Sequence, residues 1–216
     1  MSDPVCIHPS SLFEPKLSDY IPLGKLANEQ TANLLFDYFR DTKPFKWNEA
    51  NNDCEDRAEA ICMLLDKWGI TNCKGWVFNG FLMRNGNGLL VNDWGYHVAA
   101  MLPIMKGEEL WFYVIDPATC HQLTSLEDWS IRATGTGPTY FVIKRGDLYI
   151  FPNGDLYKTR WHSRNRQNYK WTMQGLAGIN GPTVIGKAQL IYKKKKIAET
   201  TKIFQQLMQS RPDFLV

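Results

Sequence analysis

The sequence predicts an α+β fold, in which helices are combined with antiparallel strands. Residues 54–68 carry apolar side chains at steps of three and four, the spacing of one helix face. Residues 74–83, 96–105 and 110–116 are rich in the β-branched and aromatic side chains that favour strands. The short turn sequence KGEE joins the last two segments, and strands joined by so short a turn run antiparallel.

One hydrophobic core is expected to serve the whole chain. A length of 216 residues with 44% hydrophobic residues allows one sizeable core and is too short for two domains of typical size. We therefore expect a single domain over residues 1–216, with an irregular, proline-containing arm at 1–25, a core at about 26–155 and a helical segment at about 185–211.

The clearest helix is the one predicted over residues 54–68. Gly69 follows it, where a helix-ending residue is expected, and Asp53 precedes it, where a carboxylate can accept hydrogen bonds from the first turn. Cys54 is therefore predicted to lie at a helix N-terminus.

The hairpin formed by residues 96–105 and 110–116 brings two polar residues together. His97 begins its first strand and Asp116 ends its second strand. In an antiparallel hairpin the start of the first strand lies beside the end of the second strand, so both side chains are expected at the same end of the hairpin.

The remaining elements follow from shorter patterns. Asn28 is expected to cap a helix that runs to Arg40. Residues 158–182 mix tryptophan and tyrosine with arginine and lysine, and this composition favours no single helix or strand. The segment is interpreted as either the rim of a site or an exposed sheet edge. Further along the chain we expect a short helix capped by Thr124 or Ser125 (125–133), a strand or a hairpin folded at 145–147 (139–152), and a helix (187–208).

Charge and hydropathy limit the classes of partner. Twenty-five basic residues against 22 acidic ones give a net charge of +3, too small and too dispersed to predict nucleic acid as the partner. No apolar stretch has membrane-spanning length, and the N-terminus lacks the pattern of a signal peptide. We expect no membrane partner, a monomer, and either a cytoplasmic location or secretion as a mature form or effector. The run Lys193–Lys196 is interpreted as a solvated helix face.

Cys54, His97 and Asp116 form a candidate catalytic triad. A thiol attacks a carboxamide as thiolate, and the positive potential of a helix N-terminus together with a nearby imidazolium lowers the thiol pKa. A carboxylate that accepts from one ring nitrogen fixes the tautomer and orients the other nitrogen toward the sulfur. Each residue also has an ordinary structural interpretation, as a buried or capping cysteine, a core histidine and an Asp-Pro turn residue.

Three segments resemble the protein glutaminases, enzymes that deamidate glutamine side chains of proteins. The matching motifs are a cysteine opening a helix and followed by Arg57 and Ala58, then Tyr-His-Val at Tyr96–Val98, then Ile-Asp-Pro at Ile115–Pro117. The similarity runs from roughly Asn52 to Trp129, a little over a third of the chain. It implies an antiparallel sheet packed on the catalytic helix, similar to the papain-like and transglutaminase-like core.

The resemblance implies a role for each residue of the triad. Cys54 is the nucleophile, His97 the general base and acid, and Asp116 the orienting carboxylate. A protein or peptide glutamine is the expected substrate, a thioester the expected intermediate, and no metal or organic cofactor is required. The backbone N–H of Cys54 is a candidate oxyanion donor. Three aromatic residues are candidate walls of a substrate cleft, namely Trp47, Trp94 and Tyr96.

Two other activities and one non-catalytic function remain open from the sequence. The same thiol, imidazole and carboxylate also serve amine transfer by transglutaminase-like enzymes and peptide cleavage by papain-like peptidases. A non-catalytic binding module is the alternative of another class. In such a module the three residues are packing residues or ligands of a metal, although no second Cys or His stands at local ligand spacing around any of them.

Overall fold

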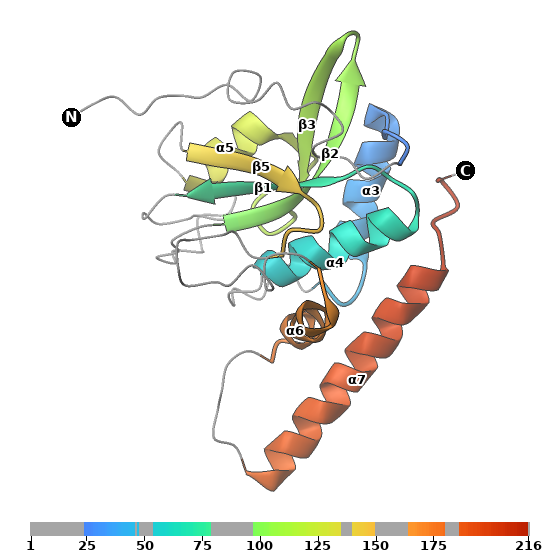
Figure 1. Cartoon of the computed structure of the whole chain (residues 1–216), viewed down its shortest axis with the longest axis vertical. Helices are drawn as coiled ribbons and strands as arrows, with labels where there is room; N and C mark the ends of the chain where they lie inside the picture. The colour runs from blue at the N-terminus through green and yellow to red at the C-terminus, as the bar shows by residue number, and fades with distance from the viewer. Residues whose placement is uncertain are drawn as a thin grey trace, which may run out of the picture.

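The computed structural model describes residues 24–45, 47, 54–78, 97–134, 140–149, 164–179 and 186–215. Elements carry the labels of Figure 1. Five strands form one sheet in the order β4-β3-β2-β1-β5, and all neighbouring strands are antiparallel. The strands are β1 (Cys73–Phe78), β2 (His97–Lys106), β3 (Glu109–Ile115), β4 (Thr124–Ser125) and β5 (Tyr140–Arg145).

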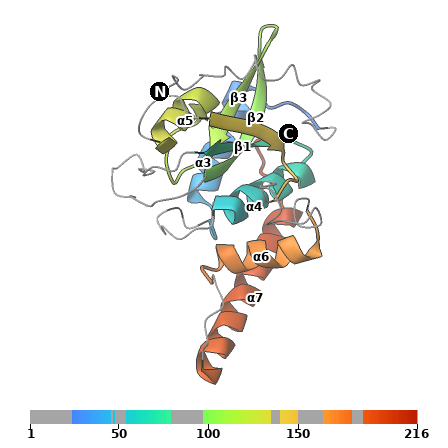
Figure 2. The same cartoon turned by 60° about the vertical axis from the view of Figure 1, so that its left-hand side comes forward.

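Helices cover both sides of this sheet. The described helices are α3 (Glu29–Asp41), α4 (Cys54–Lys67), α5 (Leu126–Thr134), α6 (Arg166–Leu176) and α7 (Lys187–Gln209). Figures 1 and 2 show α4 against one face of the sheet and α5 on the other, with α6 between α4 and α7. The first eight residues of β2 are accordingly all buried. This arrangement confirms the predicted α+β class and the antiparallel sheet packed on α4.

Helix α4 is the centre of the core. Every residue from Asp56 to Leu65 is buried, because β2 packs on one side of the helix and α6 on another. The helix ends before Gly69, whose φ of +74° is a left-handed conformation that glycine adopts without steric cost. The predicted helix and its predicted end are therefore confirmed, and Cys54 is the first residue of α4.

A buried ionic network fixes α4 against its neighbours. The ammonium of Lys74 on β1 lies 2.5 Å from the Glu59 carboxylate, and both side chains are fully buried. Arg164 contacts the other oxygen of Glu59 at 2.5 Å and Asp66 at 2.6 Å. Buried charges require such partners because an uncompensated charge in the core is costly. The network joins α4, β1 and the segment that leads into α6.

The other predicted elements are largely confirmed. Asn28 caps α3 by accepting a hydrogen bond from the Thr31 N–H at 2.8 Å. The hairpin forms with Ala100 opposite Ile115. Of the two candidate caps for α5, Ser125 is the one that accepts from a backbone N–H, that of Asp128 at 3.1 Å.

The segment 158–182, for which the sequence favours no single element, contains a helix. Its described portion contains the helix α6, capped by Asn165, whose side chain accepts from the N–H groups of Gln167 and Asn168. Interpreting it as a possible sheet edge was wrong. The first predicted strand is described only as Cys73–Phe78, so its end near residue 83 lies outside the described residues. Also outside them are the Asp53 cap and nearly all of the N-terminal arm.

Candidate active site

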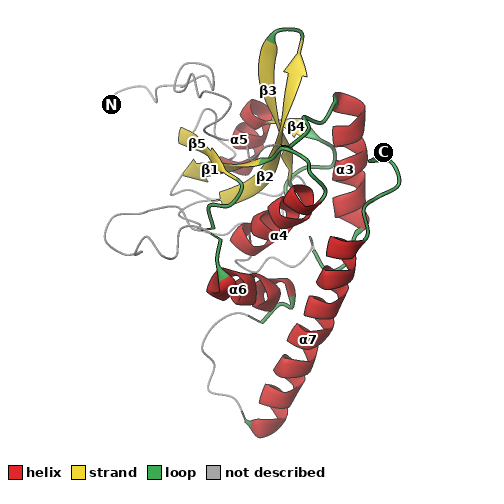
Figure 3. Cartoon of the chain, turned by 45° about the vertical axis from the view of Figure 1, so that its right-hand side comes forward, coloured by secondary structure: helices red, strands yellow, loops and turns green. Residues whose placement is uncertain are grey.

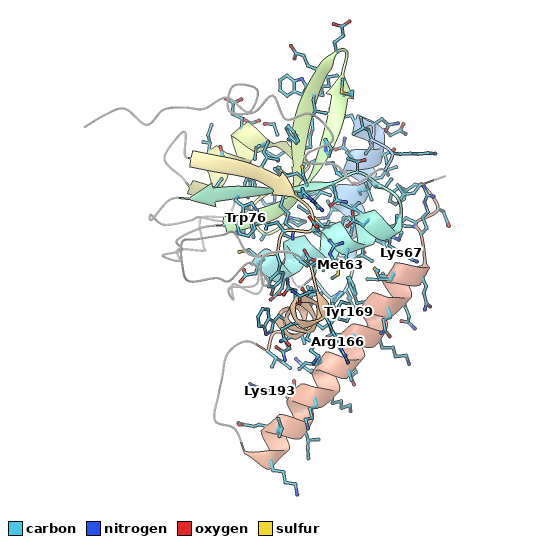
Figure 4. All side chains as sticks on the ribbon, viewed as in Figure 1. Met63, Lys67, Trp76, Arg166, Tyr169 and Lys193 are labelled. Carbon is cyan, nitrogen blue, oxygen red and sulfur yellow. The ribbon has the colours of Figure 1, made fainter. Side chains whose placement is uncertain are left out.

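Cys54 is buried at the first turn of α4. Its side chain is 7% exposed and belongs to a small apolar cluster with Ala58, Trp76 and Val98. Figure 4 labels Trp76 on β1, beside this end of α4. The first turn of a helix has backbone N–H groups without intrahelical acceptors, so the thiol lies in the positive potential of the helix end.

His97 and Asp116 meet at one end of the β2–β3 hairpin. The register pairs Ala100 with Ile115, so the first residue of β2 and the residue after β3 lie at the same edge. His97 Nε2 lies 2.8 Å from Asp116 Oδ2, and both side chains are almost completely buried. Because Asp116 engages Nε2, the other ring nitrogen, Nδ1, is the one that would exchange a proton with a nucleophile.

Two further residues hold the Asp116 carboxylate. The Thr119 hydroxyl donates to Oδ2 at 2.5 Å, and the indole N–H of Trp129 donates to the same oxygen at 2.9 Å. The Trp129 ring also lies beside the imidazole of His97, with 5.7 Å between ring centroids. The sequence interpretation missed both residues. The Asp-Pro-Ala-Thr spacing is a turn signal that points to Thr119, whereas Trp129 comes into reach only because α5 packs on the sheet.

The environment of Asp116 favours its ionised form. Burial raises the pKa of this carboxyl, but the charge of His97 and the hydrogen bonds from His97, Thr119 and Trp129 outweigh burial and lower the pKa to about 2. The ionised group therefore stabilises the fold fully above the ordinary carboxyl pKa of 3.8, and this stabilisation is lost as the pH falls toward 2.

One pocket joins the three predicted residues. Its lining includes Cys54, His97 and Asp116 together with Trp47 and Arg57. A helix start and the open end of a hairpin thus meet at one pocket. A thiol, an imidazole and a carboxylate gathered in this way have the groups needed for nucleophilic attack on a carbonyl carbon.

The surroundings of Cys54 favour the protonated form of its thiol. Burial and the neighbouring Glu55 carboxylate raise its pKa well above the ordinary thiol value, against the opposing effects of the Val98 N–H and Arg57. Cys54 Sγ donates to Glu55 Oε2 at 3.3 Å. The sequence-based expectation of a lowered pKa counted the helix end and the imidazole, whereas it did not count burial or the acidic neighbour.

The three candidate wall residues have different outcomes. Trp47 lines the pocket, donates its indole N–H to the Phe39 carbonyl at 2.9 Å, and lies 5.5 Å from the guanidinium of Arg57. Trp94 and Tyr96 lie outside the described residues. Among the residues that the structure describes, no group of three or more His, Cys, Asp or Glu side chains is arranged to hold a metal ion.

A family model described as a glutaminase matches residues 32–133. The match contains Cys54, His97 and Asp116 as well as Thr119 and Trp129. The resemblance to protein glutaminases stated above is thereby confirmed over residues 32–133, called the glutaminase region from here on. This region contains most of α3, all of α4 and of β1 to β4, and nearly all of α5. No curated protein sequence matches the chain.

Solved structures of protein glutaminases share the fold of this glutaminase region. A crystal structure of protein-glutaminase has a TM-score of 0.56 at 16% identity and covers 77% of this chain and 96% of its own. The solution structure of protein-glutaminase from Chryseobacterium proteolyticum has a TM-score of 0.51 at 19% identity, covering 63% and 82%. A crystal structure of pro-protein-glutaminase has a TM-score of 0.52 at 15% identity, covering 77% and 68%.

Proposed function

We propose that this protein hydrolyses the side-chain amide of protein-bound glutamine, giving glutamate and ammonia. The observation that carries the proposal is the pocket shared by Cys54, His97 and Asp116, within the region that matches the glutaminase family model. Protein-glutaminases are also the solved structures that share its fold. The substrate class follows from these relatives, and the roles of the residues follow from the chemistry of the pocket.

The reaction begins with transfer of the thiol proton to His97. Substrate entry excludes water and brings the carboxamide carbon to Cys54 Sγ, and His97 Nδ1 accepts the proton as sulfur attacks. Asp116 stabilises the imidazolium that results and keeps the ring oriented. The backbone N–H of Cys54 donates to the oxyanion.

The later steps of the reaction release ammonia first and glutamate second. The imidazolium returns its proton to the amide nitrogen, so the C–N bond breaks, ammonia leaves, and a thioester joins Cys54 to the substrate. His97 then takes a proton from water and the hydroxide adds to the thioester carbon. The imidazolium returns the proton to sulfur as the C–S bond breaks, which releases the thiol and a glutamic acid side chain that ionises in water. Protons and electrons balance in both halves without a redox partner.

A pair of cysteine variants tests this proposal. Cys54→Ala and Cys62→Ala change two buried cysteines of the same helix, of which only Cys54 lines the pocket. With casein as substrate, we expect the unmodified protein and Cys62→Ala to release ammonia and raise the product mass by about one dalton per glutamine, whereas Cys54→Ala releases none.

Two other results would contradict deamidation. Cleaved casein chains would indicate a peptidase, and incorporation of an added primary amine would indicate amine transfer, because all three reactions pass through an acyl enzyme. Equal ammonia release by Cys54→Ala and by the unmodified protein would remove Cys54 from the mechanism.

A further inference from the structure

Helix α7 is held to the rest of the molecule by its C-terminal half. Thr200 and Phe204 are its buried residues, and Phe204 contacts the ring of Tyr169 on α6 with centroids 6.4 Å apart. Figures 1 and 3 show the N-terminal half running away from the sheet and α4, with the start of α7 at the far end. Lys193, labelled in Figure 4, lies on this projecting part.

Three consecutive exposed apolar residues follow Lys187, Ala188 and Gln189 in the projecting half. Leu190 is 44% exposed, Ile191 60% and Tyr192 57%. Consecutive residues of an α-helix are separated by about 100° around its axis, so these three side chains point in different directions instead of forming one stripe. The apolar surface therefore extends around most of the helix circumference, about one turn from its N-terminal end.

A run of lysines follows at once. Lys193–Lys196 occupy the next turn and likewise point to all sides of the helix. Helix α7 contains six lysines and one glutamate, a net charge of +5, in a chain whose formal total is +3. Positive charge is thus concentrated on this one element, and the remainder of the chain is net negative.

We propose that the N-terminal half of α7, residues 187–196, binds the surface of an anionic lipid bilayer. The apolar side chains of residues 190–192 would enter the boundary of the acyl chains, and Lys193–Lys196 in the next turn would reach the surrounding phosphates. This interaction is independent of the reaction proposed at Cys54. It departs from the sequence-based expectation of no membrane partner, because the exposure of residues 190–192 becomes evident only in the folded chain.

Other occupants fit the same surface less well. A groove in a protein would cover one face of the helix and leave the other apolar residues and lysines in water. A second copy paired around this segment would bring two lysine runs together, and like charges at such distances repel. Insertion is peripheral, since within the described residues no helix is long and apolar enough to cross a membrane.

Vesicle sedimentation of the full chain tests the proposal. We expect at least about tenfold more protein with phosphatidylcholine vesicles that contain about 30% phosphatidylserine than with phosphatidylcholine alone, and loss of this binding near 0.5 M salt. Two variants should lose it: one with Leu190, Ile191 and Tyr192 changed to Ser, and one with Lys193–Lys196 changed to Gln.

A matched control separates a local effect from total charge. Changing four exposed lysines elsewhere to Gln, Lys25, Lys43, Lys67 and Lys170, alters the net charge equally and should leave vesicle binding unchanged. Equal loss of binding in this control would overturn the proposal, as would full binding by the serine variant. Binding to a polyglutamate peptide without binding to the vesicles would overturn it in favour of an acidic protein partner. An unchanged circular dichroism spectrum and an unchanged urea midpoint show that a variant is folded.

Discussion

Helices α4 and α7 form for opposite reasons. In α4, 14 residues long, Cys54 and every residue from Asp56 to Leu65 are buried, whereas in α7, 23 residues long, Thr200 and Phe204 are the buried ones. Helix α4 is stabilised by its packing in the core, where charged residues of the helix such as Glu59 have buried partners. Lysine, alanine and glutamine, which have high intrinsic helix propensity, support α7. A buried helix can position a nucleophile closely, and an exposed one can present charge and apolar surface to a partner.

The largest effect is expected at the site that α4 helps to form. Asp116→Asn keeps the size of the side chain but removes the charge that orients His97 and stabilises its protonated form. The amide also presents an N–H group where the carboxylate accepts hydrogen bonds. We expect kcat for ammonia release to fall about 10³- to 10⁴-fold. Asp213→Asn, at an exposed position, is the control and should keep full activity. A loss of less than tenfold would show that His97 does not depend on Asp116.

The next largest effect concerns the buried network on α4. Glu59→Ala leaves the ammonium of Lys74 fully buried without its carboxylate and removes one partner of Arg164. Such a change lowers the free energy of unfolding by about 3–5 kcal/mol. Urea denaturation measures the loss. Lys67→Ala, exposed on the same helix, should change the value by less than about 0.5 kcal/mol. Similar values for the two variants would mean that α4 is not held by this network.

The elements that form the core were also the ones that the sequence could predict. Residues 54–68 show helical periodicity and the hairpin shows strand composition, so α4, β2 and β3 were predicted, and with them the meeting of His97 and Asp116. These depend on local patterns and on one short turn. The position of Cys54 in the same pocket required the family resemblance, because no local pattern states how α4 packs on β2.

Features created by tertiary packing were not predictable in this way. Trp129 donates a hydrogen bond to Asp116, which lies 13 residues earlier in the sequence. From the sequence alone, Lys74 and Glu59 resemble ordinary surface charges, although they form a buried ion pair. The raised pKa of Cys54 follows from burial, which a sequence does not display directly. Helix α6 was missed because its aromatic and arginine residues show no single apolar stripe, although Asn165 was a recognisable cap.

A matched pair of isoleucines compares the two helices directly. Ile61 on α4 is 1% exposed, and Ile191 on α7 is 60% exposed. Ile61→Ala removes buried apolar contacts and leaves a cavity, so it should lower the free energy of unfolding by about 2–5 kcal/mol. Ile191→Ala should change it by less than about 0.5 kcal/mol. Thermal or urea unfolding of both variants measures the difference. Equal losses would show that the projecting half of α7 packs on the domain in solution.

The smallest effect is expected from the residue beside the nucleophile. Glu55 accepts the hydrogen bond from the Cys54 thiol, and its charge is one of the causes that raise the thiol pKa. Glu55→Gln removes that charge, so the thiolate forms at lower pH. We expect the pH profile of Cys54 alkylation by iodoacetamide to shift to lower pH and the rate at neutral pH to rise several-fold. The variant Glu127→Gln, which neutralises an exposed carboxylate on α5, should leave the profile unchanged. A shift of the Glu55→Gln profile toward higher pH would mean that Glu55 assists proton removal. In that case the carboxylate would act with His97 as a base when Cys54 loses its proton.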